Sequence, residues 1–326
     1  MFDLVTSLNL LDVVELAEST KITYRGYEDK AFLTAPFNLR LAEKTIKSLS
    51  VSDISDYLCP TRRDLYFKKG KNKTCKKRLV RTWGMNAGNI VEDYFFYIFE
   101  KEIGTNTYPT YDSLKMIAET RNDEFERNYK DKLEALEKLK ARDSESTEWF
   151  LNLLCQAGKV SLSSRSLDDK LSSGGAGDLI RETDLKRLRI NPDVVQIGIS
   201  KGVKPDFLLP SHRIVGDIKS GVIGFKDYFL HTCTGYALAY ENAMGRGNDI
   251  DFGVISFFPT RCSDFAKPIS FQQTYVFLID DELRTQFMRR RNEAYEIISQ
   301  DAPPEVPSDC EKCVLCTFKN SCIGVQ

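Results

Sequence analysis

Two carboxylates on neighbouring predicted strands constrain this chain more than any other feature of its sequence. Two apolar stretches are separated by only the four residues 210–213, which predicts a β-hairpin with a short loop. If Leu209 lies opposite Ile214 in that hairpin, counting back along both strands places Asp206 opposite Asp217. Like charges that face each other across strands destabilise a sheet. The sequence therefore predicts a hard divalent cation held between these two carboxylates.

Lys219 adds a positive charge to the same predicted site. Side chains alternate along a strand, so Lys219 and Asp217 share one face. An ammonium group beside the cation can position a water or stabilise the charge that develops on a phosphate. The oxygen-rich ligand set favours Mg²⁺ or Mn²⁺. The alternative is an acidic edge hairpin whose side chains point at solvent, which is the usual meaning of an isolated Asp-x-Lys.

The hydrophobic pattern around the hairpin predicts an α/β fold. The predicted strands are 194–199, 206–209, 214–219, 252–258 and 274–279, and the predicted helices are 50–58, 88–100, 225–243 and 280–299. Residues 111–160 are rich in charge, with leucines at helical spacing, and predict an inserted helical arm.

The overall charge gives no sign of a nucleic-acid partner, so any basic surface is local. Lys and Arg number 46 against 47 Asp and Glu, and the formal net charge is -1. One local basic stretch lies between residues 62 and 81, and its alternative interpretation is a solvated face. The candidates for contacts with DNA phosphates are Arg62, Arg63, Lys76, Lys77, Arg78 and Arg81, with Tyr66 and Trp83 as candidates for stacking on unpaired bases.

The sequence predicts a cytoplasmic protein without a membrane partner. Its first residues lack the basic and apolar segments of a signal peptide, and no stretch reaches the roughly 18 apolar residues of a membrane span. The cytosol keeps thiols reduced, so the nine cysteines argue against a disulfide framework.

Four cysteines near the end of the chain predict a metal centre: Cys310, Cys313, Cys316 and Cys322. Either all four bind zinc locally, or three of them join a distant fourth around an iron–sulfur cluster. A centre that anchors this short segment has a folding rationale, because the segment is too short to bury a core of its own. Unliganded thiols in a frayed tail are the remaining alternative.

The hairpin resembles the signature of the PD-(D/E)XK nucleases. That signature is Pro205-Asp206, ten intervening residues, and then Asp217-x-Lys219 on a second strand. The resemblance implies a restriction-endonuclease-like α/β core, with a mixed sheet flanked by helices. It also implies that Asp206, Asp217 and Lys219 are catalytic and that the two carboxylates bind Mg²⁺ or Mn²⁺.

Two further motifs are similar to those of the RecB-like branch. The branch carries Gly-x-x-x-His on the helix before the sheet, and here Gly88 is followed by Glu92 in the place of histidine. The resemblance makes Glu92 a metal ligand, while the alternative is an exposed helix carboxylate. The branch also has Gln-x-x-x-Tyr after the sheet, where this chain keeps Tyr236 as a catalytic candidate and has Thr232 instead of glutamine. His231 is next to the altered position.

The segment around Cys59-Pro60 resembles the first-cysteine motif of RecB-like exonucleases that carry an iron–sulfur cluster. In that family the other ligands have the spacing Cys-x2-Cys-x5-Cys, which implies Cys59, Cys313, Cys316 and Cys322 as the four ligands here. The resemblance favours a 4Fe-4S cluster over zinc. Cys310 is then a substitute ligand or a free thiol.

Together these motifs resemble the CRISPR-associated RecB-like exonucleases, the Cas family four, and their longer archaeal relatives of the Csa-one type. The resemblance implies an enzyme that trims DNA, chiefly single-stranded ends or overhangs, during spacer acquisition, together with the integrase and other adaptation proteins. One rival is an inactive DNA-binding scaffold subunit, and another is a zinc-stapled protein unrelated to nucleic acid.

The same resemblance divides the chain into five segments. They are an N-terminal extension at 1–50; a segment at 51–100 with the first cluster cysteine, the basic stretch and the first core helix; a helical insertion at 101–190; the nuclease core at 191–300; and the cysteine segment at 301–326. The first and last cysteine segments are expected to form one helical iron–sulfur lobe.

Overall fold

The structure is a computed structural model that describes residues 16, 19–56, 59–70, 127, 188–221, 225–259, 273–308, 313 and 316–323. Its helices are η1 (Asp29–Ala31), α2 (Ala35–Ala42), α3 (Val51–Ser55), α4 (Arg63–Lys69), α8 (Val194–Ile197), η4 (Pro210–His212), α9 (Asp227–Met244), α10 (Asp281–Ser299) and α11 (Lys319–Ile323). Its strands are β1 (Phe207–Leu209), β2 (Ile214–Gly221), β3 (Phe252–Pro259) and β4 (Gln273–Leu278).

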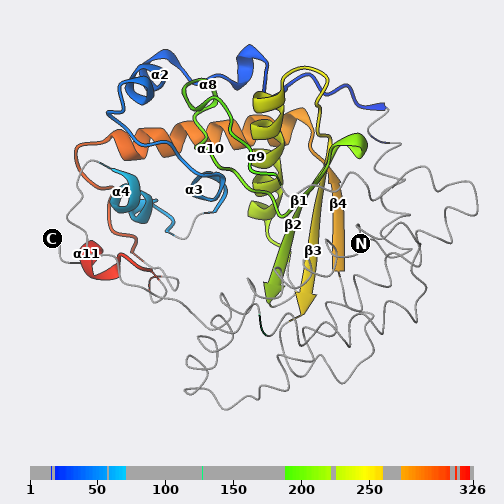
Figure 1. Cartoon of the computed structure of the whole chain (residues 1–326). Coiled ribbons are helices and arrows are strands. Elements are labelled where there is room, and N and C mark those ends of the chain that lie inside the picture. Colours follow the sequence, from blue (N-terminus) through cyan, green and yellow to red (C-terminus); the bar gives the residue numbers. More distant parts are fainter. Residues whose placement is uncertain are drawn as a thin grey trace, which may run out of the picture.

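One mixed four-stranded sheet forms the centre of the fold, in the order β1-β2-β3-β4 (Figure 1). The pairs β1–β2 and β3–β4 are antiparallel, and β2–β3 is parallel. The parallel pair is connected through α9, as a parallel pair requires a crossover. The sheet with its flanking helices confirms the predicted α/β fold.

The hairpin has the predicted register. Leu209 pairs with Ile214 and Phe207 pairs with Gly216. The loop is the short helix η4, followed by Arg213 in the left-handed conformation at φ 60°. The ring of Phe207 lies over Gly216, where a Cβ atom would come within 1.8 Å of the ring. Glycine is thus required directly before Asp217, and the aromatic ring over it helps to fix the register.

Helix α9 covers the face of the sheet that carries the odd-numbered side chains of β2 (Figure 1). Val215 of β2 and Cys233 of α9 belong to the same buried core. Helix α10 crosses α9 and also packs against α3 and α4. Asp280 caps α10 by accepting the backbone N–H of Leu283 at 2.9 Å.

The strand predicted over 194–199 is wrong, because most of it forms the short helix α8. The carboxylate of Asp193 accepts the backbone N–H groups of Val195 and Gln196, which caps this helix at its start. Gly198 ends it with a φ of 74°, which glycine adopts readily. Ile199 alone makes an isolated bridge, with Leu49. Local capping outweighs the strand preference of a run of β-branched residues.

The described part of the segment 1–50 is packed into the main core. Leu33 and Leu49 are 3% and 0% exposed. Asp281 of α10 accepts the backbone N–H groups of Thr23 and Tyr24. These contacts make residues 19–50 a part of the α/β unit, although the sequence suggested no role for them.

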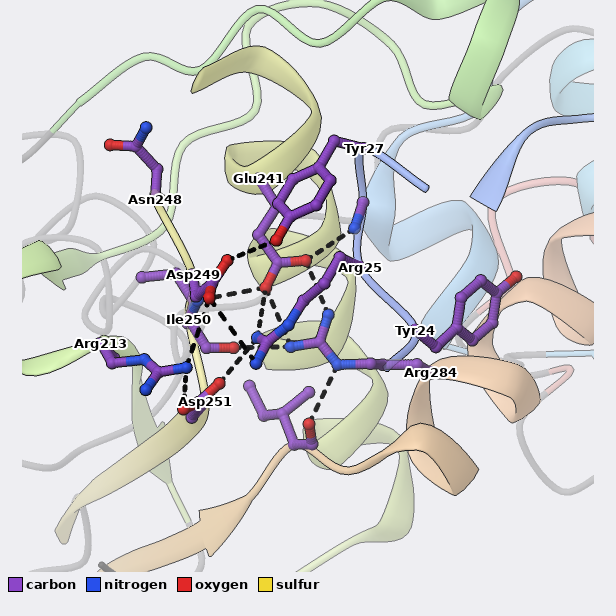
Figure 2. Close-up of polar contacts among 12 residues, drawn as sticks. Tyr24, Arg25, Tyr27, Arg213, Glu241, Asn248, Asp249, Ile250, Asp251 and Arg284 are labelled. Atoms are coloured by element: carbon purple, nitrogen blue, oxygen red, sulfur yellow. Dashed lines mark hydrogen bonds and ion pairs between the residues drawn. The ribbon is translucent and has the colours of Figure 1, made fainter. Parts of the chain in front are cut away.

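A buried ionic network fixes this N-terminal segment to the sheet and to both long helices (Figure 2). At its centre is Glu241 of α9, which is 0% exposed. Its carboxylate accepts hydrogen bonds from Arg25 at 3.0 Å and from both terminal nitrogens of Arg284 at 2.7 and 3.0 Å. The backbone N–H groups of Gly26 and Ile250 complete the shell at 2.7 and 3.1 Å. Every oxygen of this buried carboxylate therefore has a partner.

The outer part of the network balances its charge. Arg25 also donates to Asp251 at 2.7 Å, and Arg213 lies 2.5 Å from the second oxygen of that residue. Tyr27 donates its hydroxyl proton to Asp249 at 2.8 Å, and Arg213 reaches Asp249 at 3.5 Å. Together the inner and outer parts of the network contain three guanidinium groups and three carboxylates. The network therefore carries no net charge.

Within the described part of the chain, no helix is long and apolar enough to cross a membrane.

Candidate active site and cysteine lobe

Asp206 and Asp217 come together next to the start of β1. The strand pairing ends at Phe207 opposite Gly216, so these aspartates are the next two residues along their strands. The carboxylate of Asp206 accepts the backbone N–H of Ile218 at 2.5 Å. That hydrogen bond holds the Asp206 carboxylate alongside β2, beside the buried Asp217, which is 2% exposed.

Lys219 lies on the same face of β2 and contacts Asp217. Its Nζ forms an ion pair with Oδ2 of Asp217. Burial by itself would lower the pKa of Lys219, but the negative charges of Asp217 and then Asp206 outweigh it and raise the pKa. Lys219 therefore stays protonated and supplies positive charge, and it is unsuited to act as a general base.

The start of α9 forms the other wall of this site. Lys219 Nζ lies 5.5 Å from the ring centre of Phe229. Burial raises the pKa of the Cys233 thiol, and the charge of Asp217 raises it further. Burial also raises the pKa of Tyr228, and the negative charge of Asp56 at the end of α3 raises it further. The site thus lies between β2, the first turns of α9 and the end of α3.

The donor set fits a divalent cation in its chemistry. Two carboxylates and one ammonium group leave one negative charge, and carboxylate oxygens suit Mg²⁺ and Mn²⁺. Among the residues that the structure describes, no three His, Cys, Asp or Glu side chains are close enough to hold a metal together. The predicted third ligand, Glu92, lies outside the described residues.

Helix α9 also carries Thr232, Tyr236 and His231. Thr232 donates its hydroxyl proton to Ser55 of α3 at 3.0 Å, and Tyr236, one helical turn later, shares that face. Tyr236 packs half-buried against the main core. His231 is 4% exposed, and burial followed by the charge of Arg290 lowers its pKa to about 4. His231 is therefore neutral near pH 7 and faces α10.

Segments from both halves of the chain form a second, smaller unit, the cysteine lobe, which consists of residues 59–69, 301–308, 313 and 316–323. Figure 1 shows α4 and α11 close together at one side of the molecule. Tyr66 donates its hydroxyl proton to the carbonyl of Asp301 at 3.0 Å, and Thr61 donates to that of Glu305 at 2.9 Å. The rings of Phe67 and Phe318 lie 6.3 Å apart in its small core.

Two cysteines of this lobe, Cys316 and Cys322, pack in or against its small core. Cys316 is buried, and burial raises its pKa, with further increases from Cys59 and Cys322. The backbone N–H of Cys316 donates to the carbonyl of Cys313 at 3.2 Å, so Cys313 begins the same turn. Cys59 and the described cysteines of the other chain end thus belong to one lobe, but in the described part of the chain no three of them are close enough together to hold a metal. Cys310 lies outside the described residues.

The two described arginines of the basic stretch point inward. Arg62 and Arg63 are 6% and 5% exposed. Arg62 donates to the carbonyl of Ile54 at 3.0 Å, while Arg63 donates to those of Pro304 and Cys322. Tyr66 is also buried, at 1% exposure. The structure thus gives these side chains packing contacts within the protein, where the sequence had suggested contacts with DNA.

The remaining predicted contacts with DNA lie outside the described residues: Lys76, Lys77, Arg78, Arg81 and Trp83. The same holds for the predicted helix at 88–100 and for nearly all of the predicted insertion at 101–190.

Sequence reasoning missed Tyr228, which the charges of Asp217 and Lys219 reach, and Asp56, whose charge acts on Tyr228. No motif marks either residue, because each reaches the site only through the packing of α3 against α9. It also missed Phe225, whose exposed ring lies near the start of α9. A cluster of aromatic residues at the start of the predicted helix 225–243 was the available signal.

The comparison with known families also indicates a nuclease. The model of a family described as CRISPR-associated exonuclease Csa1 matches residues 10–325, nearly the whole chain. This match defines the chain as a CRISPR-associated nuclease. More particularly, it belongs to the Csa1 family of CRISPR-associated exonucleases, which confirms the resemblance seen in the sequence. No curated protein and no solved structure matches the chain.

Proposed function

We propose that this protein is a divalent-metal-dependent deoxyribonuclease that shortens DNA from single-stranded ends or overhangs. The observation that carries the proposal is the pair Asp206 and Asp217, brought together on the sheet beside the protonated Lys219. Two neighbouring carboxylates are stable beside a cation, and a phosphodiester needs positive charge around the atom under attack.

Each residue has a separate role in this proposal. Asp206 and Asp217 hold Mg²⁺ or Mn²⁺, with Glu92 as the third ligand. The bound cation supplies an activated water and offsets the negative charge of the phosphate. Lys219 holds a further positive charge beside the phosphate, and Tyr236 is a further member of the catalytic group. Lys76, Lys77, Arg78 and Arg81 bind the DNA backbone.

We also propose that the cysteine lobe holds a 4Fe-4S cluster through Cys59, Cys313, Cys316 and Cys322. Thiolate ligands suit such a cluster, and the proximity of Cys59 to Cys316 and Cys322 supports the set. The PD-(D/E)XK sheet would then act as the catalytic unit, with the lobe beside it. With both sites, the protein would be a RecB-like enzyme in the cytoplasm. It would process DNA for spacer acquisition together with the integrase and other adaptation proteins.

Cleavage assays under controlled metal conditions test the nuclease proposal. We expect protein purified without oxygen to shorten labelled single-stranded DNA and overhangs when Mn²⁺ or Mg²⁺ is added, and to be inactive with a chelator. Re-addition of excess metal should restore the activity. Protein that binds DNA but cleaves none of these substrates with either metal would instead be a scaffold subunit, which contradicts the proposal.

Iron analysis of a Cys59 variant tests the cluster proposal. Wild-type protein purified without oxygen should be brown and contain about four iron atoms per chain, whereas Cys59→Ser should lose most of the iron and unfold at a lower temperature. Cys233→Ser is the control, because Cys233 is a buried cysteine of α9 away from the lobe. It should keep its iron. Stoichiometric zinc without iron in the wild type, or full iron in Cys59→Ser, would refute this ligand set.

A further inference from the structure

A row of aromatic side chains begins beside Lys219 and extends across the sheet. Phe257 is the cross-strand partner of Lys219 on β3. Its ring centre lies 5.5 Å from that of Phe229 and 5.7 Å from that of Tyr275. Phe257 and Phe229 are buried, at 2% and 4% exposure. These rings form a rigid support behind the carboxylate site, because packed aromatic rings in such edge-on arrangements stabilise one another.

Phe225 lies at the outer end of this row. Its ring centre is 4.9 Å from that of Tyr275 and 6.3 Å from that of Phe229. Unlike the rings behind it, Phe225 is 37% exposed. Part of a supported aromatic ring is therefore open to solvent, next to the first turn of α9.

The charges around Phe225 favour an anionic ligand. Lys226 follows it directly and is exposed, with Nζ 5.8 Å from the ring centre of Tyr228. Lys219 supplies the second ammonium group, 5.5 Å from the ring centre of Phe229. A flat apolar ring beside the exposed cation of Lys226 complements a nucleotide, which combines a flat base with a phosphate.

The sheet places this surface close to the proposed point of cleavage. Asp217 pairs with Ile255 on β3, and Ile255 pairs with Tyr275 on β4. Two strand spacings, about 10 Å, therefore separate the backbone at Asp217 from that at Tyr275. A DNA strand with a phosphate at the carboxylate pair can thus place a neighbouring base on Phe225 only if that base is unpaired.

We propose that Phe225, supported by Tyr275 and Phe229, is the platform on which an unpaired base of the substrate stacks, and that it selects single-stranded DNA. The inference rests on the proposed nuclease function and adds its substrate-selecting residue. Base pairing keeps the face of a base inside the duplex, so a duplex cannot use this platform.

Binding measurements without added divalent cation test the platform separately from cleavage. Phe225→Ala should weaken the binding of a short single-stranded oligonucleotide by roughly 5- to 100-fold, the loss expected for one stacked base. Phe225→Trp should bind at least as tightly as the wild type. Phe225→Leu keeps apolar packing but lacks an aromatic face, so it should resemble Phe225→Ala. Leu39→Ala, at an exposed leucine of α2, is the matched control and should bind like the wild type.

Oligonucleotides with one abasic position locate the stacked base. At one position near the end, removal of the base should abolish the difference between wild type and Phe225→Ala, because both then lack the same contact. If Phe225→Ala is folded and binds every single-stranded oligonucleotide like the wild type, the platform is refuted, even where the wild type cleaves DNA. If the wild type cleaves no DNA, but Phe225→Ala binds single strands more weakly than the wild type does, the nuclease proposal fails and the platform stands.

Discussion

Asp217→Asn should abolish DNA cleavage while leaving the protein folded. The substitution removes one of two neighbouring carboxylates and with it the main anchor of the proposed metal. Loss of several kcal/mol of transition-state stabilisation corresponds to a decrease in rate of about 10³-fold or more. Lys219 still faces Asp206 in the variant, and the repulsion between carboxylates is relieved, so the free energy of unfolding should hold or rise. Rates from single-turnover cleavage and a thermal melt measure both effects.

The control for this prediction is Asp227→Asn, an exposed aspartate in the first turn of α9. It should cleave DNA at a rate close to that of the wild type. Asp206→Asn should match Asp217→Asn, and Lys219→Met should slow cleavage while metal affinity is largely kept. Binding of single-stranded DNA should be nearly unchanged in the three aspartate variants. Substantial cleavage by Asp217→Asn would show that the carboxylate pair is not the active centre.

Glu241→Gln should cause the largest loss of stability of any single substitution in the α/β unit. The buried guanidinium groups of Arg25 and Arg284 both depend on this carboxylate. Glutamine has nearly the same shape but carries no charge, so Arg284 remains buried without its counter-ion, while Arg25 keeps only its contacts with Asp251 and Asp249. Breaking a buried ion pair in this way costs about 3–5 kcal/mol. Chemical denaturation should show a decrease of that size in the free energy of unfolding.

Two further variants make this measurement specific. Glu282→Gln removes an exposed glutamate on α10, which bonds only to Gln286 among the contacts described, and should change stability by no more than about 0.5 kcal/mol. Glu241→Gln combined with Arg284→Met should recover part of the loss, because one unpaired cation is removed with its partner. A decrease below about 1 kcal/mol for Glu241→Gln would mean that water or other groups compensate the two arginines.

The carboxylate hairpin was predictable from the sequence because its determinants are local. Four loop residues and the alternation of side chains determine which residues face each other, and the observed register agrees. The long helices α9 and α10 were predictable for the same reason, from their local apolar pattern. The strand predicted over 194–199 failed because a four-residue helix leaves too short a pattern to distinguish from a strand.

Features that depend on distant residues could not be predicted. Arg25 and Glu241 are 216 residues apart in the chain, so nothing local marks them as partners. The burial of Arg62 and Arg63 in the basic stretch could not be predicted for a similar reason. Composition there indicates an exposed cationic surface, but backbone carbonyls from other segments bond both guanidinium groups inside the protein. The neighbours of the carboxylate pair at Asp56 and Tyr228 likewise depend on how α3 packs against α9.

The cysteine lobe also determines the order of events during protein synthesis. Arg63 bonds to the carbonyl of Pro304, a residue 241 positions further along the chain. At about 5–20 residues per second, helix α4 leaves the ribosome roughly 10–50 s before its partner is made. Throughout that interval Cys59 is without the cysteines of the other chain end that belong to the same lobe in the folded protein. The proposed metal centre, which both segments would share, would therefore be loaded only after translation has almost finished, and a truncated chain could not acquire it.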